Sequence, residues 1–208
     1  MDVREMNTKR IPTLFIASLL IVACTSAKAL EGGAQAPAFE LKDLSGKSVS
    51  LSDFNGKTVV LEWFNRGCPF VQKHYRGGDM QTLQKEFSEK GIVWLLVNST
   101  HSGHKDYLDN ETAKKVASEW KITSASLLPD ESGVIGRAYR AKTTPHMFIV
   151  NPEGKLAYQG AIDDKSDVFS NPKEANNYVR QALNEMLSGK EISIPSTEAY
   201  GCSVKYGS

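Results

Sequence analysis

The chain has 208 residues and a formal net charge of +1, with 40% hydrophobic and 24% charged residues. This length and apolar content suffice for one domain of ordinary size with a buried core, plus extensions. The basic residues form no stripe or cluster with interleaved aromatic residues, so we expect no nucleic-acid partner.

Residues 1–29 have the pattern of a signal peptide. Lys9 and Arg10 precede an uncharged apolar run over 11–23 that is too short to span a bilayer comfortably, and small residues follow it. We therefore expect secretion across the inner membrane. Ala27-Lys28-Ala29 fits an ordinary signal-peptidase site, which would leave a periplasmic protein. The run ending at Cys24 also resembles the bacterial lipobox, so the alternative is a lipoprotein anchored to the membrane at Cys24.

The cysteine count changes on export. Cys24 is either discarded or lipidated, so the mature protein keeps Cys68 and Cys202 in a compartment where disulfides persist. The two thiols have three possible fates: a stable bridge, a catalytic pair that cycles, or two independent thiols. Spacing in the sequence does not choose among them.

The predicted domain begins after a Gly- and Ala-rich leader over 30–36. Two short alternating segments, 37–41 and 48–51, are separated by a turn and predict a β-hairpin. An apolar run beginning at residue 58 then predicts a buried strand that Gly67 ends.

Cys68 follows this strand at the predicted entrance of a helix, because Pro69 is tolerated in a first helical turn. Backbone N–H groups and the positive end of the helix dipole favour a thiolate at such a position, which makes a cysteine nucleophilic. The alternative is that Cys68 is a small buried hydrophobic residue.

The remaining elements are predicted from apolar periodicity. The first helix is expected to run from Pro69 to Lys90, kinked or split at Gly77-Gly78 and capped by Gly91. The other expected elements, in order, are a central strand over 92–97, a helix over 110–120 with Asn110 as a possible N-cap, a strand over 126–128, a short helix over 130–138, strands over 147–150 and 156–160, a helix opened by Pro172 and ended by Gly189, and an irregular tail over 190–208.

This order predicts an α/β protein with the thioredoxin-like fold over 37–189: a central mixed sheet flanked by helices, with an N-terminal β-hairpin extension. The handedness of the crossovers places the leading ends of both main helices at the carboxyl edge of the sheet. Cys68 is expected at that edge.

Two motifs carry a resemblance to a known family over residues 37–187. The first comprises residues 60–65 followed by Gly67-Cys68-Pro69, and the second runs from Thr144-Pro145 to Val150. In this order they resemble the thioredoxin superfamily, in its exported redoxin branch with TlpA-like proteins and AhpC/TSA domains. The resemblance implies that Cys68 is the nucleophile and that Thr144 and Pro145 form a cis-proline loop that binds substrate. Val71 stands where thioredoxins carry the second cysteine of Cys-x-x-Cys, so that thiol is absent.

Two further residues are assigned through the resemblance. Glu62 falls where thioredoxins have a carboxylate buried beneath the active site, and burial would raise its pKa so that it accepts a proton near neutrality. The alternative is an edge residue facing water. Leu61 and Asn65 occupy the places of the Pro and Thr of the peroxiredoxin signature, and we expect Asn65 to hydrogen-bond an incoming oxygen.

Other polar residues are weaker candidates. Arg66 or Arg137 would stabilise the thiolate if either lay beside it, and each is otherwise a surface charge. Three histidines would form a zinc or copper site with Cys68 only if they converged, and they are otherwise solvated loop residues: His101, His104 and His146. We predict no metal and no cofactor.

Cys202 lies in the tail. Related exported redoxins end in a similar Gly-Cys-Ser-x-Lys-Tyr segment, so the resemblance implies a role for this cysteine. A tail that folds back to Cys68 would supply the resolving thiol that is missing at Val71. The alternative is a free or structural cysteine on a mobile tail.

Together these features predict an exported thiol oxidoreductase in which Cys68 attacks a peroxide or a protein disulfide, Cys202 resolves the product and a thiol donates electrons. The alternative from another class is a thioredoxin-fold binding module without dithiol turnover that holds a partner peptide or a metal.

Overall fold

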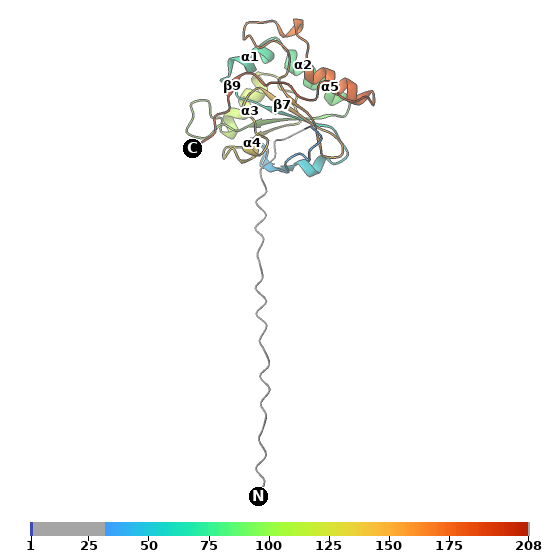
Figure 1. Cartoon of the computed structure of the whole chain (residues 1–208). Coiled ribbons are helices and arrows are strands. Elements are labelled where there is room, and N and C mark those ends of the chain that lie inside the picture. Colours follow the sequence, from blue (N-terminus) through green and yellow to red (C-terminus); the bar gives the residue numbers. More distant parts are fainter. Residues whose placement is uncertain (2–31, 208) are drawn as a thin grey trace.

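The computed structural model describes Met1 and residues 32–207, so the predicted signal peptide and Cys24 lie outside the described residues. Five strands form the central sheet, in the order β5-β4-β3-β7-β8 (Figure 1). The β3–β4 and β4–β5 pairs are parallel, and β7 pairs antiparallel with both β3 and β8. The strands are β3 (Val59–Trp63), β4 (Val93–Asn98), β5 (Ser126–Pro129), β7 (His146–Val150) and β8 (Leu156–Gly160).

Both faces of the sheet are covered, as the continuous apolar runs of β3 and β4 predict. Four helices pack on one face: α1 (Pro69–Arg76), α2 (Asp79–Glu89), α3 (Asn110–Glu119) and α5 (Tyr178–Leu187). The other face is covered by the hairpin β1 (Glu40–Lys42) and β2 (Ser48–Ser50), the 3-10 turn η1 (Leu51–Phe54) and α4 (Val134–Ala138). Figure 1 shows α1, α2 and α5 on one side of the sheet and α4 on the other. The fold is therefore thioredoxin-like, with the predicted mixed sheet and N-terminal hairpin.

The long first helix is split at the two glycines. Gly77 ends α1, and Gly78 begins α2 with a φ of 79°, in the left-handed region that glycine tolerates. The break lets the second half turn back onto the sheet.

Three helix starts differ from the predictions. Asp109, not Asn110, is the N-cap of α3, because its carboxylate accepts the N–H of Thr112. The fourth helix is shorter than 130–138, since Gly133 has a φ of 69° and the chain enters the helix only after it. Pro172 opens only a 3-10 turn, η2 (Pro172–Glu174), and α5 begins after Asn177, whose side chain accepts the N–H of Arg180.

The tail is more ordered than predicted. Its strand β9 (Cys202–Ser203) pairs antiparallel with β6 (Thr143–Thr144), just before the cis-proline loop. Val204 then packs against the buried apolar residues on the face of the sheet that the β1–β2 hairpin and α4 cover. The prediction of an irregular tail was therefore wrong at this point, because hydrogen bonds to β6 decide its conformation.

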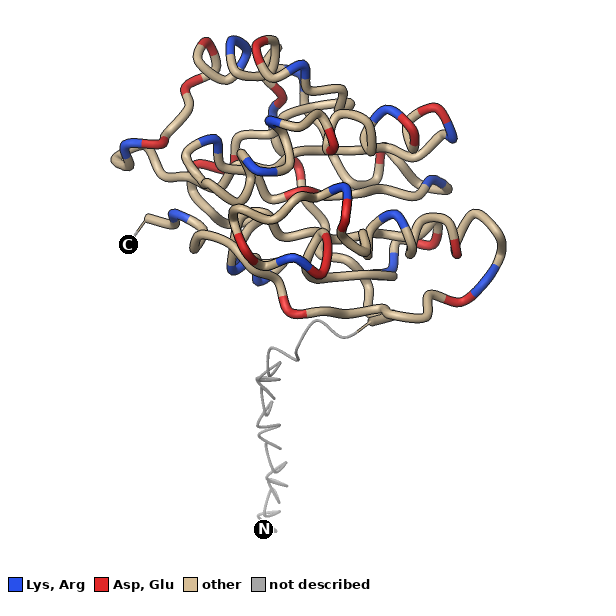
Figure 2. Tube along the Cα trace, turned by 90° about the horizontal axis from the view of Figure 1, so that it is seen from above, with Lys and Arg blue, Asp and Glu red and all other residues tan. Residues whose placement is uncertain are grey.

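Charge is spread over the molecule. Figure 2 shows lysines and arginines interspersed with acidic residues along the traced chain, and neither sign gathers in one part of this view. Within the described residues, the helices are too short or too polar to cross a bilayer.

Candidate active site

The loop after β3 fixes Cys68 at the start of α1. Cys68 is the N-cap residue, with extended backbone angles, and Pro69 is the first helical residue. Asn65 shapes the approach: its Oδ1 accepts the N–H of Gly67 at 2.7 Å, and its carbonyl oxygen accepts the N–H of Cys68 at 3.1 Å. The Cys68 sulfur therefore lies at the positive end of the α1 dipole.

The cis-proline loop lies against this sulfur. The Thr144–Pro145 peptide bond is cis, as the resemblance implies. Cys68 is only 2% exposed, and its Sγ donates a hydrogen bond to the carbonyl oxygen of Thr144 at 2.9 Å. The two predicted motifs thus meet at Cys68.

The tail brings the second thiol to the first. Cys202 lies opposite Thr144 in the β6–β9 ladder, and its side chain hydrogen-bonds to that of Cys68. The pKa of Cys202 is raised to about 11, mainly by burial and in addition by the hydrogen bond and the charge of Cys68. Both are free thiols in this structure. Cys202 is therefore held protonated, as a donor to Cys68.

A cavity of about 220 Å³ opens beside the two sulfurs. It is lined by Cys68, Cys202, Asn65, Gly67, His104, Lys105, Asp106 and Lys205. Lys205 lowers the pKa of Cys202, whereas the carboxylate of Asp106 raises it. Asp106 also packs on Gly67, where an added Cβ would lie 2.3 Å from its Cγ.

Sequence reasoning missed three of these residues: Lys105, Asp106 and Lys205. Lys205 belongs to the tail motif around Cys202, which was the available signal. Lys105 and Asp106 follow the loop after β4 and showed no pattern of their own. Their place in the site depends on how that loop folds over Gly67.

Glu62 is a buried carboxylate, so the alternative of an edge residue facing water was wrong. Burial raises its pKa to about 7, although three hydrogen bonds oppose the rise. The donors are Tyr75 Oη at 2.8 Å, Trp94 Nε1 at 2.9 Å and Gln84 Nε2 at 3.1 Å. Tyr75 lies on α1, so Glu62 touches the helix that Cys68 begins and not the thiol itself.

Both the oxygen and the nitrogen of the Asn65 side-chain amide make hydrogen bonds within the protein. Besides accepting from Gly67, it donates through Nδ2 to Thr100 Oγ1 at 3.1 Å. It also lines the cavity beside Cys68. Its binding of an incoming oxygen stays a prediction.

Of the other candidates, His104 lines the cavity beside Cys68, whereas Arg137, His101 and His146 do not. Arg137 stacks over the Tyr206 ring and donates to the carbonyl oxygen of Gly207, so it holds the end of the tail. His146 is buried, and burial lowers its pKa to about 4. The rings of His101 and His104 meet edge to face, with centroids 5.9 Å apart. Within the described residues, no three His, Cys, Asp or Glu side chains are grouped to hold a metal.

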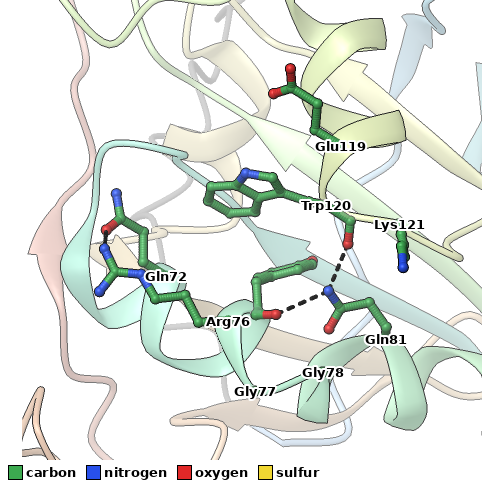
Figure 3. A pocket seen from close by; sticks show the side chains of 9 residues that line it. Gln72, Arg76, Gly77, Gly78, Gln81, Glu119, Trp120 and Lys121 are labelled. Atoms are coloured by element: carbon green, nitrogen blue, oxygen red, sulfur yellow. Dashed lines mark hydrogen bonds between the residues drawn. The ribbon is translucent and has the colours of Figure 1, made fainter.

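A second hollow, of about 420 Å³, lies where α1 breaks into α2 (Figure 3). Gln81 bridges its walls by donating to the carbonyl oxygens of Tyr75 and Trp120 at 3.0 and 2.6 Å. Its lining residues do not include a cysteine.

A cysteine at a helix entrance, a cis-proline loop against its sulfur and a second thiol in contact define a thioredoxin-fold redox protein. The profile of the AhpC/TSA family matches residues 33–159. The chain belongs to this family. No curated protein matches the chain.

Solved structures agree with this assignment. An uncharacterized conserved protein from Geobacillus kaustophilus is 28% identical with a TM-score of 0.75, over 86% of this chain and 93% of that one. A hypothetical protein from Sinorhizobium meliloti also has a TM-score of 0.75, at 22% identity over 87% and 97% of the chains, and shows the fold alone. A thiol:disulfide interchange protein from Bacteroides is 30% identical with a TM-score of 0.52, over 62% and 81%.

Proposed function

We propose that this protein is an exported thiol oxidoreductase in which Cys68 attacks the oxidant and Cys202 resolves the product. The observation that carries the proposal is the contact between the two thiols at the entrance of α1. Cys202 takes the part of the missing second cysteine of the helix. Val71 occupies the position of that second cysteine in α1, and it is buried in the core.

With a hydroperoxide, the Cys68 thiolate attacks one peroxide oxygen and the O–O bond breaks. Cys68 becomes a sulfenic acid, and the leaving oxygen takes a proton and departs as water or an alcohol. The Cys202 thiol then loses its proton and attacks the Cys68 sulfur, which forms the disulfide and releases water. Two equivalents of a donor thiol reduce the disulfide and become oxidised to a disulfide themselves.

With a disulfide, Cys68 first forms a mixed disulfide and releases one thiol. Cys202 then attacks the Cys68 sulfur, so the second thiol leaves. The Bacteroides thiol:disulfide interchange protein supports this branch by similarity. In both branches, Lys105 and Lys205 place positive charge at the cavity where thiolates form.

Export is supported by the signal-peptide pattern of residues 1–29. The proposed cycle also fits an exported protein, because a disulfide between Cys68 and Cys202 would persist outside the cytosol. The mature protein is then periplasmic or anchored through Cys24. Mass spectrometry of the protein from a membrane and a soluble fraction gives its first residue and any lipid on Cys24.

Thiol-dependent turnover tests the function. Cys68→Ser is expected to abolish turnover of hydrogen peroxide and of a disulfide substrate, because no nucleophile remains. Cys202→Ser is expected to stop the cycle after the first step, with sulfenic acid or a mixed disulfide on Cys68. Equal turnover by the unmodified protein and Cys68→Ser would support a binding module and overturn the proposal.

A further inference from the structure

The tail covers the edge of strand β6. Thr144 lies opposite Cys202, Thr143 lies opposite Ser203, and the N–H of Val204 donates to the carbonyl oxygen of Lys142 at 3.0 Å. An uncovered strand edge is where an extended polypeptide adds to a sheet. In this protein its own tail has that place, directly beside Cys68.

The tail is fastened on both sides of Cys202. Before it, the Tyr200 hydroxyl donates to the buried carboxylate of Asp163, and its ring packs edge-on against Phe70 of α1 at 5.9 Å. Beyond it, the Tyr206 hydroxyl donates to the carbonyl oxygen of Ala141 at 2.7 Å. β9 is therefore held to the domain at two anchors.

The remaining access to Cys68 is small. The sulfur is almost fully buried, and the cavity beside it measures about 220 Å³, below the roughly 300–1,000 Å³ of ordinary ligand pockets. A hydroperoxide of a few heavy atoms fits this space. A polypeptide disulfide has to bring two sulfurs in line with Cys68, and β9 stands where its backbone would lie.

We propose that β9 is a selectivity lid, which admits small hydroperoxides to Cys68 and excludes the disulfides of polypeptides. The inference rests on the proposed function. It states which of the two oxidants reaches Cys68 in the first step. The chemistry of that step is unchanged: Cys68 gives a sulfenic acid with a hydroperoxide, and a mixed disulfide plus one released thiol with a polypeptide disulfide.

Gly201 offers a way to lift the lid without replacing Cys68. Its φ is +137°, and a Cβ there would lie 2.1 Å from the carbonyl oxygen of Thr144. Gly201→Ala is therefore incompatible with the β6–β9 pairing. Gly189→Ala is a matched control, because Gly189 also has a positive φ, of 68°, but its Cβ would meet no atom within 4 Å.

The experiment uses the full chain with Cys202→Ser, so that the product of the first step stays on Cys68. Each variant is mixed with hydrogen peroxide plus a sulfenic-acid trap, or with a disulfide-linked peptide, and the Cys68 fragment is followed by mass spectrometry. Gly201→Ala is expected to raise the rate with the peptide at least about tenfold and to change the rate with peroxide less than about threefold. Gly189→Ala is expected to react like the protein with its lid intact.

The outcomes separate the two proposals. If Cys68 reacts with the disulfide-linked peptide at the same rate with and without Gly201→Ala, the lid proposal is wrong and the proposed function is unaffected. A Cys68 that reacts with neither oxidant in any variant overturns the proposed function itself. If Gly201→Ala does not fold, Tyr200→Ala removes the first anchor instead, and a peptide rate unchanged in that variant also overturns the lid.

Discussion

Thr144 lies directly opposite Cys202 in the short ladder that joins β6 to β9. The carbonyl oxygen of the same threonine accepts the hydrogen bond of the Cys68 thiol. One residue beside the cis-proline thus positions both sulfurs. Both sulfurs therefore lie at the same cavity beside the cis-proline.

The titration of Cys202 reports this contact. Replacing Cys68 by alanine removes one hydrogen bond and one charge that raise the pKa of Cys202, so this pKa is expected to fall from about 11 toward the ordinary value of 9. Burial keeps it above 9, because burial is the largest cause. The pH dependence of Cys202 alkylation measures the change. An unaltered profile would show that the thiols do not interact.

Lys205 and Asp106 shift the pKa of Cys202 in opposite directions. Lys205→Gln is expected to raise the pKa of Cys202, and Asp106→Asn to lower it. Gly67→Ala displaces the Asp106 carboxylate, so it lowers the same pKa, and the double variant Gly67→Ala, Asp106→Asn adds little to either single change. Alkylation profiles of the four variants provide the measurement. Full additivity would place Asp106 away from Gly67.

Glu62 makes stability depend on pH. Because burial raises its pKa from 4.5 to about 7, the folded protein holds a proton that the unfolded chain releases. The contribution of Glu62 to stability is therefore fully present below pH 4.5 and is lost as the pH rises to about 7, by about 3 kcal/mol. Glu62→Gln keeps the shape and removes this loss. Urea unfolding from pH 4 to 8 compares the two slopes, and parallel slopes would contradict the raised pKa.

Tyr200→Phe tests the first anchor of the tail. The ring contacts with Phe70 remain, but Asp163 loses the hydroxyl donor to its Oδ1, and its Oδ2 has no hydrogen-bond partner among the described residues. A destabilisation of about 1–3 kcal/mol is expected, together with faster alkylation of Cys202. Adding Asp163→Asn removes the buried charge and is expected to recover part of the loss. No change in either measurement would mean that Tyr200 does not hold the tail.

Local patterns in the sequence determined most of the fold and half of the site. Alternating and 3.6-residue periods predict the strands and helices, and the Gly-Cys-Pro and Thr-Pro motifs identify Cys68 and the cis-proline loop. Burial of Glu62 was implied by the family resemblance, and the structure confirms it. Helix starts were less accurate, because Asp109, Asn110 and Asn177 are all plausible caps until their hydrogen bonds are known.

Only the tertiary structure decided where the tail goes. Cys202 meets Cys68 because Gly201 passes close to Thr144 and because Tyr200 and Tyr206 anchor the chain on either side. These contacts join residues far apart in the sequence, and no periodicity encodes them. The same holds for Asp106 and Lys205, which reach the thiols through the folding of a loop and of the tail. Sequence therefore pointed to Cys68 as the candidate nucleophile, and the packed structure shows Cys202 beside it.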